Sequence, residues 1–210
     1  MIKVGITGQS GFVGTHLFNV LGANPEKYTC ISFEDSFFED ELKLRSFVKK
    51  CDVIVHLAAM MRSPIEGEVY KVNMQLVHKL IDAMNIEEVA PCILFSSSIQ
   101  EGNGSEYAIC KEETRKLLAN WANEHKTGFL GMMFPNLFGP GAKPYSHSFI
   151  ATFCHQLSHD KEPKILVDNT VPLKYIDTIV NEILEYIEII TKDKTVSSIH
   201  ILPEYKLKVT

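Results

Sequence analysis

Short apolar runs alternate with longer amphipathic segments along the first 135 residues of the chain. The short runs predict buried strands at 2–7, 28–33, 52–58, 93–96 and 128–134. The segments between them predict helices at 12–21, 39–50, 69–84 and 106–124. Strands that alternate with helices imply right-handed βαβ crossovers. We therefore expect an α/β fold with a Rossmann-like, doubly wound parallel sheet.

This rhythm changes after residue 135. Prolines and glycines crowd into ten residues, at Pro135, Gly139, Pro140, Gly141 and Pro144. Such clusters mark loops, and the chain beyond them is a shorter mixed region. We place a boundary here, between a first domain at 1–135 and a small lobe at 136–210 that is integral to one compact unit.

Composition narrows the classes of protein that this chain can belong to. It has 210 residues, 45% of them apolar, and a formal net charge of -5. These values fit a globular protein and offer no basic field to nucleic acid or to an anionic membrane. The apolar runs are too short to span a bilayer, and the chain begins with a strand rather than a signal region. Five scattered cysteines without a Cys-x-x-Cys spacing fit free thiols, so we expect a cytoplasmic protein.

The first predicted strand runs into three spaced glycines, Gly8, Gly11 and Gly14, and then into a helix. Gly8 permits a tight turn, Gly11 lets the backbone approach a pyrophosphate, and Gly14 allows close helix–strand packing. The helix N-terminus offers amides and a positive dipole end to the phosphates. The pattern predicts that residues 1–135 form a dinucleotide-binding domain, the alternative being a glycine-rich turn without a ligand.

An acidic residue follows the second predicted strand, where such domains meet the adenosine ribose. Glu34 lies twenty residues after Gly14, and no arginine or lysine stands near it before Lys43 and Arg45. A carboxylate accepts hydrogen bonds from the ribose 2′-hydroxyl and repels a 2′-phosphate, which favours NAD over NADP. The alternative is that Glu34 and Asp35 are solvated loop carboxylates.

Tyr107 and Lys111 lie four residues apart, on one face of the predicted helix 106–124. A lysine beside a tyrosine favours the phenolate and is expected to lower the tyrosine pKa. Such a tyrosine can protonate a carbonyl oxygen that receives hydride, or deprotonate an alcohol in the reverse direction. Ser96, Ser97 and Ser98 end the fourth strand, where ligands bind in such sheets, and a hydroxyl there can bind the substrate oxygen. The alternative is a serine loop that satisfies its own backbone.

The order of these motifs resembles the extended short-chain dehydrogenase/reductase superfamily, which includes nucleotide-sugar epimerases, dehydratases and reductases. The segments that carry the resemblance are the glycine turn, 52–59, Asn73, 96–98, the Tyr107/Lys111 pair and 135–139. The chain resembles in particular the bacterial capsular polysaccharide reductases that make UDP-2-acetamido-2,6-dideoxy-L-talose, through 95–100, 135–139 and 148–154.

The resemblance implies roles for single residues. Tyr107 would be the acid/base, Lys111 its partner and Ser98 the catalytic serine, with Ser97 as the second choice. The positions that the resemblance implies bind NAD or NADP are Gly8, Gly11, Phe12, Val13, Gly14, Ala58 and Ala59. The chemistry of the residues adds Glu34 at the adenosine ribose and Lys111 at the nicotinamide ribose. The positions implied to bind substrate in the lobe 136–210 and beside it are Ser97, Asn136 and Lys143.

Some positions depart from the pattern of the superfamily. Tyr107 follows Ser98 by only nine residues, a contraction that the capsular reductases share. Dehydratases carry Asp-Glu after the catalytic serine, and Ile99-Gln100 stands here instead, which argues against dehydration. Many relatives bind substrate phosphate with an arginine where this chain has Val171, and Lys174 is the candidate to compensate. The capsular reductases use NADP, which conflicts with the indication from Glu34.

These observations predict NAD(P)-dependent reduction of a 4-keto nucleotide sugar for surface polysaccharide synthesis. Two alternatives stay open: a nucleotide-sugar epimerase that retains NAD, and a non-catalytic dinucleotide-binding accessory subunit. The resemblance implies a homodimer through the helices 69–84 and 106–124. The chain lacks the further helix and cupin domain of the capsular reductases, so we expect a truncated or minimal substrate lobe. No metal site is expected, because His155 and His159 have no third ligand beside them.

Overall fold

The computed structural model describes residues 1–146, 148–165 and 168–209, and its largest element is a six-stranded parallel sheet. The sheet has the order β2-β1-β3-β4-β5-β8, and every neighbouring pair is parallel. Its strands are β1 (Ile2–Thr7), β2 (Tyr28–Ile31), β3 (Val53–His56), β4 (Cys92–Ser98), β5 (Phe129–Phe134) and β8 (Val196–His200). Because β2 and β3 lie on opposite sides of β1, the winding reverses there, and ligands bind at such a switch point.

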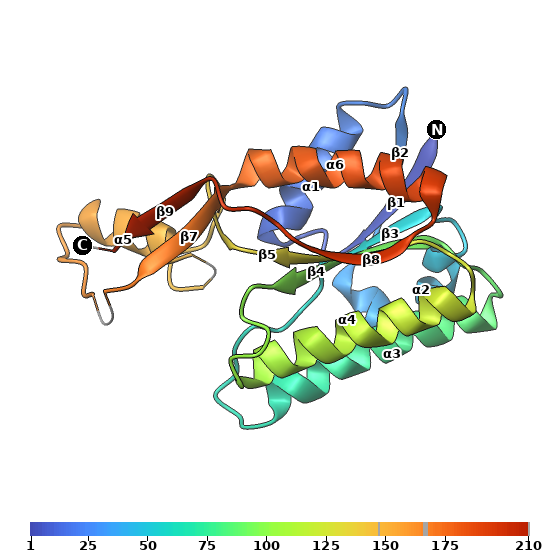
Figure 1. Ribbon diagram of the computed structural model, residues 1–210, viewed down its shortest axis with the longest axis horizontal. Coiled ribbons are helices and arrows are strands. Elements are labelled where there is room, and N and C mark those ends of the chain that lie inside the picture. Colours follow the sequence, from blue (N-terminus) through green and yellow to red (C-terminus); the bar gives the residue numbers. More distant parts are fainter. Residues whose placement is uncertain (147, 166–167, 210) are drawn as a thin grey trace.

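Helices cover both faces of this sheet (Figure 1). One face carries α1 (Phe12–Gly22) and α6 (Ile176–Asp193). The other carries α2 (Glu41–Val48), α3 (Glu68–Ile86) and α4 (Glu106–Glu124). A sheet covered on both faces needs strands that are apolar throughout, and all four residues of β3 are buried.

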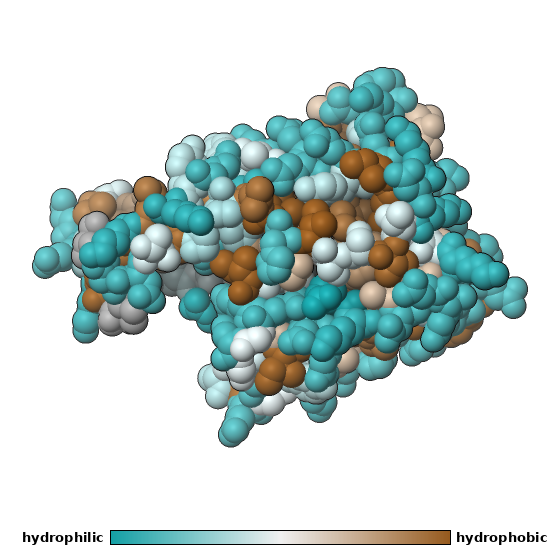
Figure 2. Space-filling view, viewed as in Figure 1, coloured by the Kyte–Doolittle hydropathy of each residue, from teal (hydrophilic) through white to brown (hydrophobic). Residues whose placement is uncertain are grey.

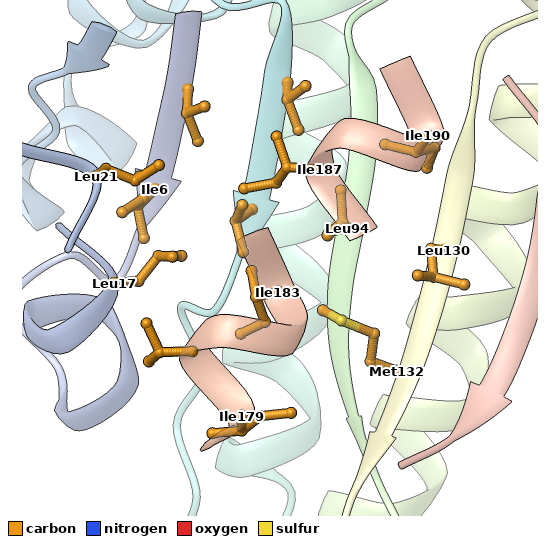
Figure 3. Close-up of a cluster of buried hydrophobic side chains, with 14 of the residues drawn as sticks. Ile6, Leu17, Leu21, Leu94, Leu130, Met132, Ile179, Ile183, Ile187 and Ile190 are labelled. Carbon is orange, nitrogen blue, oxygen red and sulfur yellow. The ribbon is translucent and has the colours of Figure 1, made fainter. Parts of the chain in front are cut away.

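Side chains alternate between the two cores along each strand. In β3, Val53 and Val55 join the core under α1 and α6, whereas Ile54 joins the core under α2, α3 and α4. Figure 3 shows the first core, in which α6 lays a stripe of isoleucines over the sheet. The stripe consists of Ile179, Ile183, Ile187 and Ile190, spaced at helical intervals.

A second, three-stranded sheet lies beside the main sheet. It has the order β6-β7-β9, with β6 (Asn136–Phe138) parallel and β9 (Tyr205–Lys208) antiparallel to β7 (Thr170–Tyr175). The helix α5 (Phe149–Leu157) precedes β7. In Figure 1 these elements form a lobe beyond the ends of β4 and β5.

The predicted α/β fold with a doubly wound parallel sheet is confirmed. The helix predicted at 106–124 has these bounds, whereas the one predicted at 39–50 begins at Glu41, after a 3-10 helix, η1 (Asp35–Glu39). The boundary predicted after residue 135 falls where the chain passes from β5 to the second sheet. After β7 the chain returns to the main sheet, where α6 packs on one face and β8 is an edge strand. Among the described residues, no helix is both long and apolar enough to cross a membrane.

Candidate active site

A cavity of about 570 Å³ opens at the carboxyl ends of β1, β3, β4 and β5. Figure 2 shows the surface indented between the lobe and the helices α3 and α4 in the same view as Figure 1. Most of the residues predicted from the sequence line the cavity: Gly8, Gly11, Phe12, Val13, Gly14, Ala58, Ala59, Ser97, Ser98, Tyr107, Lys111 and Asn136. Glu34 and Lys143 do not line it.

The glycine turn between β1 and α1 leaves no room for side chains. Gly8 has a φ of +70°, a left-handed conformation that favours glycine, and a Cβ there would lie 2.8 Å from the Ala58 nitrogen. A Cβ on Gly14 would lie 2.2 Å from the Gly8 carbonyl oxygen. Gly11 caps the N-terminus of α1 without a side chain, so the first amides of the helix face the cavity bare. The turn is therefore shaped to cradle a phosphate group.

Of the two adjacent carboxylates after β2, the one that lines the cavity is Asp35, one residue further along than predicted. Asp35 lines the cavity and accepts a hydrogen bond from the Ser10 hydroxyl at 3.1 Å. Glu34 is exposed and accepts a hydrogen bond from Ser36 at 3.3 Å. Both carboxylates are visible in the sequence. The 3-10 helix η1 begins at Asp35, and this residue is the one that faces the glycine turn.

The ends of β1 and β3 are joined behind the cavity by buried polar groups. The Thr7 hydroxyl lies 2.7 Å from the His56 Nδ1 and accepts a hydrogen bond from the Ala58 amide at 3.4 Å. Burial, together with the charge of Lys111, lowers the pKa of His56 to about 3, so this ring is neutral at physiological pH. The Asn73 side chain accepts from the Met60 amide and donates to the Met60 carbonyl, both at 2.8 Å. These contacts fix the segment after β3 that lines the cavity.

The helix α4 brings Tyr107 and Lys111 to the same cavity. Ser105 caps the helix by accepting a hydrogen bond from the Ala108 amide at 3.2 Å. The Lys111 ammonium is buried, donates to the Ser96 carbonyl at 2.7 Å and lies 5.5 Å from the centre of the Tyr107 ring. The spacing predicted from the sequence thus places the phenol and the ammonium side by side.

The predicted lowering of the Tyr107 pKa is wrong. Burial, followed by the charge of Cys110, raises the pKa of Tyr107 to about 12. Burial also lowers the pKa of Lys111 to about 8, against the opposing effects of Cys110 and Glu101. Sequence spacing placed the two groups together, but it does not show the burial of the phenol, which raises its pKa.

The three serines at the end of β4 have different partners. Ser98 accepts a hydrogen bond from the Gln100 amide at 3.1 Å, so its own proton is free to be donated into the cavity. Ser97 donates to the carboxylate of Glu101, and Ser96 donates to the His56 carbonyl at 3.3 Å. Ser98 is therefore the serine best placed to bind a substrate oxygen, and Ser97 is engaged with the protein.

The residues predicted to bind substrate differ in whether they line the cavity. Asn136 lines the cavity and donates to the Pro172 carbonyl at 3.2 Å. Lys143 is exposed outside the cavity. Lys174 is buried, forms an ion pair with Glu182 at 2.6 Å and donates to the Leu202 carbonyl at 2.8 Å. Lys174 therefore lies away from the cavity, and this position does not support the expectation that it replaces the missing arginine.

Several lining residues were not predicted, among them Asp35, Phe38, Met60, Met61 and Gln100. Gln100 follows the serine triplet, so its place in the sequence was the available signal, whereas Phe38 depends on the fold of η1. In the described part of the chain, no group of three or more histidines, cysteines or carboxylates could hold a metal ion. The rings of His155 and His159 lie 4.1 Å apart, centre to centre.

The site therefore combines a phosphate cradle, a proton donor, a buried cation and a free serine hydroxyl at the switch point of a doubly wound sheet. This combination agrees with the dinucleotide-binding domain that the order of the sequence motifs predicts. Residues 4–192 match the sequence model of the NAD dependent epimerase/dehydratase family, and the chain belongs to that family.

Two relatives define the chain's position further. It is 28% identical, over 216 residues, to UDP-2-acetamido-2,6-beta-L-arabino-hexul-4-ose reductase of Pseudomonas aeruginosa, a match that covers 99% of this chain and 55% of the relative. It is 27% identical, over 134 residues, to sterol-4-alpha-carboxylate 3-dehydrogenase, decarboxylating, of Dictyostelium discoideum, covering 54% of this chain and 41% of the relative. The chain thus spans about half the length of the curated relatives that it matches.

Solved structures agree with this placement. The capsular polysaccharide assembling protein CapF from Staphylococcus aureus superposes with a TM-score of 0.75 and 30% identity, over 99% of this chain and 54% of that one. UDP-glucuronic acid 4-epimerase from Bacillus cereus, solved with NAD, superposes with a TM-score of 0.82 and 18% identity, over 99% and 81%. At that identity the second match shows the shared fold.

Proposed function

We propose that this chain catalyses the NAD(P)-dependent reduction of a 4-keto nucleotide sugar, as a step toward a surface polysaccharide precursor. The observation that carries the proposal is the convergence of Ser98, Tyr107 and Lys111 on a cavity that begins at the glycine turn. The likeness to a nucleotide-sugar 4-ulose reductase over 99% of the chain supports it.

The residues present fit a nicotinamide dinucleotide. The turn at Gly8, Gly11 and Gly14 and the bare amides of α1 would hold the pyrophosphate, and Asp35 would accept hydrogen bonds from the adenosine ribose. Lys111 would bind the ribose next to the nicotinamide. When bound, the dinucleotide supplies the hydride for the keto carbon.

The proton in this reaction comes from Tyr107. With its pKa raised to about 12, the phenol carries its proton throughout the physiological range, which is the state that a proton donor needs in the reductive direction. Ser98 donates a second hydrogen bond to the same oxygen of the substrate. The charge of Lys111 then stabilises the phenolate left behind.

The substrate side is assigned from the cavity lining. Asn136 and Gln100 would contact the sugar or its diphosphate, because both line the cavity beyond Ser98. Glu34, Lys143 and a direct role of Ser97 in substrate binding stay predictions from the sequence. We also propose that the enzyme is a cytoplasmic homodimer that assembles through α3 and α4, following the resemblance of those helices.

The test is turnover of UDP-2-acetamido-2,6-beta-L-arabino-hexul-4-ose with NADH or NADPH, in the wild type and in Tyr107→Phe. We expect the substitution to lower kcat by about 10²–10⁴-fold, the usual contribution of a positioned acid, with unchanged dinucleotide affinity. Tyr28→Phe is the matched control, since the Tyr28 hydroxyl donates to Glu188 at 2.9 Å outside the cavity. Turnover in Tyr107→Phe close to that of the wild type would contradict the assignment.

The same assay separates the alternatives. A stereoisomer of the substrate formed without net consumption of reduced dinucleotide would indicate an epimerase that retains NAD. Tight dinucleotide binding without any conversion would indicate an accessory subunit.

A further inference from the structure

A largely buried ion pair lies next to the serines at the end of β4. Arg115 donates to the Glu101 carboxylate from Nε at 2.9 Å and from Nη2 at 2.7 Å, a two-pronged arrangement. The side chains of Glu101 and Arg115 are only 12% and 20% exposed. The same carboxylate accepts the hydroxyl proton of Ser97, directly before the catalytic Ser98. Such a pair is costly to bury and needs all of its hydrogen bonds satisfied.

The pair joins the two segments that carry the catalytic groups. Glu101 lies on the short connection between β4 and α4, and its amide donates to the Ser98 carbonyl at 3.1 Å. Arg115 lies on α4, one turn beyond Lys111 and two turns beyond Tyr107, so the three side chains share one stripe of the helix. A single ion pair therefore connects the segment of Ser98 to the helix of Tyr107.

Two neighbouring strands, β5 and β8, contact the Arg115 side chain. A Cβ on Gly131 of β5 would lie 2.7 Å from the Arg115 Cδ, so the missing side chain lets the arginine lie across the strand. On β8, Ser198 accepts a hydrogen bond from the Arg115 Nη1 at 3.3 Å. The arginine is thus held from the side away from Glu101 as well.

We propose that Glu101 and Arg115 are positioning residues that fix the distance between Ser98 and Tyr107 by holding residues 99–105 against α4. This inference rests on the proposed function. Ser97 belongs to the same network as a support, which explains why its hydroxyl points to Glu101 rather than to a substrate. Catalytic groups need such support because a displacement of about 1 Å can cost about 10²-fold in rate.

The experiment compares Glu101→Gln with Glu87→Gln. Glu87 is the matched control, because its carboxylate is 13% exposed, pairs with Arg45 at 2.8 Å and lies between α2 and α3, outside the cavity. We expect Glu101→Gln to lower kcat by about 10- to 100-fold, with KM and dinucleotide affinity little changed. Glu87→Gln should leave all three values near those of the wild type.

A second readout does not depend on turnover. The Ile99 amide donates to the Phe134 carbonyl at 3.0 Å and the Gln100 amide donates to Ser98, so hydrogen–deuterium exchange reports the order of this segment. We expect Glu101→Gln to speed exchange in residues 97–105 and Glu87→Gln to leave it unchanged. If Glu101→Gln fails to fold, the double variant Glu101→Gln/Arg115→Gln, which leaves no unpaired charge, takes its place in both readouts.

The outcomes separate the two claims. A wild-type chain that reduces no keto-sugar contradicts the proposed function, and exchange in 97–105 then decides whether the pair holds the segment. An active wild type whose Glu101→Gln variant keeps its kcat overturns the positioning role, whatever the exchange shows. Equal losses of kcat in Glu101→Gln and Glu87→Gln overturn it too, because the effect would then be one of general stability.

Discussion

Lys111 carries a buried positive charge in the candidate site. Its ammonium is buried, donates to the Ser96 carbonyl at 2.7 Å and lies 4.8 Å from the centre of the Phe95 ring. These contacts offset part of the cost of burying a charge, but burial still lowers its pKa from 10.5 to about 8. Lys111 is thus a cation at neutral pH that loses its proton under mildly alkaline conditions.

This pKa predicts how the reductive rate depends on pH. Above a pH of about 8 Lys111 becomes neutral and no longer stabilises the phenolate, so kcat/KM should fall as pH rises through that value. Tyr107, with a pKa of about 12, keeps its proton across the same range and adds no second fall. Initial rates over a pH series measure this.

The control for the pH profile is Lys111→Arg. An arginine stays charged throughout, so whatever activity it retains should show no fall near pH 8. A wild-type profile that stays flat up to the ordinary lysine pKa of 10.5 would contradict the role given to Lys111.

The two adjacent carboxylates after β2 give a second prediction for single residues. Asp35 lines the cavity and Glu34 does not, so Asp35→Asn should shift the ratio of NADPH to NADH affinity toward NADPH. We expect a change of about fivefold, because two charges about 4 Å apart interact by about 1 kcal/mol in water. Glu34→Gln is the matched control. Fluorescence titration with both dinucleotides measures the ratio, and a shift in Glu34→Gln alone would reverse the assignment.

The element that shapes the cofactor end of the site is the turn from β1 into α1. A side chain on Gly8 would meet Ala58, whereas one on Gly11 or Gly14 would meet the Gly8 oxygen. The turn therefore depends on contacts within itself and with the segment after β3. It presents the helix amides to the cavity because no side chain covers them.

A methyl group at Gly14 should disrupt this turn. It would lie 2.2 Å from the Gly8 oxygen, so we expect Gly14→Ala to unfold more easily by about 1–3 kcal/mol and to lose dinucleotide affinity. Gly22→Ala, at the other end of the same helix, meets no atom within 4 Å and should stabilise the protein by about 0.5–1 kcal/mol. Denaturant unfolding and dinucleotide titration test both, and wild-type affinity in Gly14→Ala would refute the cradle.

The elements were predictable where local patterns determine them. Apolar runs predicted the strands, and the amphipathic pattern and the Ser105 cap fit the start of α4 at Glu106. The partners of Arg115 were not predictable. Its contacts with Glu101 and Ser198 join residues far apart in the sequence and depend on the absence of a side chain at Gly131. Lys174 likewise reads as a free cation in the sequence, until α6 places Glu182 beside it.

At the scale of the whole molecule, one sheet and the helix α4 together position the residues that line the cavity. The carboxyl ends of its strands supply the glycine turn, the segment after β3 and the serines, and the lobe closes the cavity with Asn136. The isoleucines of α6 seal the opposite side of the sheet from α4 (Figure 3). Because α6 and β8 lie between β7 and β9 in the chain, the lobe is joined to the main sheet before β6, after β7 and before β9.

The family could be recognised from the order of the motifs, because the glycine turn, the serines and the Tyr107/Lys111 pair lie at fixed places in the fold. The protonation states could not, since they depend on burial that only the packed structure shows. The positions of the lobe's candidate residues were not predictable either, since Lys143 and Lys174 lie away from the cavity.

In the proposed reaction, hydride passes from a nicotinamide to a keto carbon of a nucleotide sugar. Its most direct test is to incubate the protein with UDP-2-acetamido-2,6-beta-L-arabino-hexul-4-ose and a reduced dinucleotide deuterated at the transferable position, and to weigh the sugar product. We expect one deuterium on the sugar carbon that carried the ketone, and about 10²–10⁴-fold less of this labelled product with Tyr107→Phe over the same time. A sugar product without deuterium, or no product at all, would contradict it.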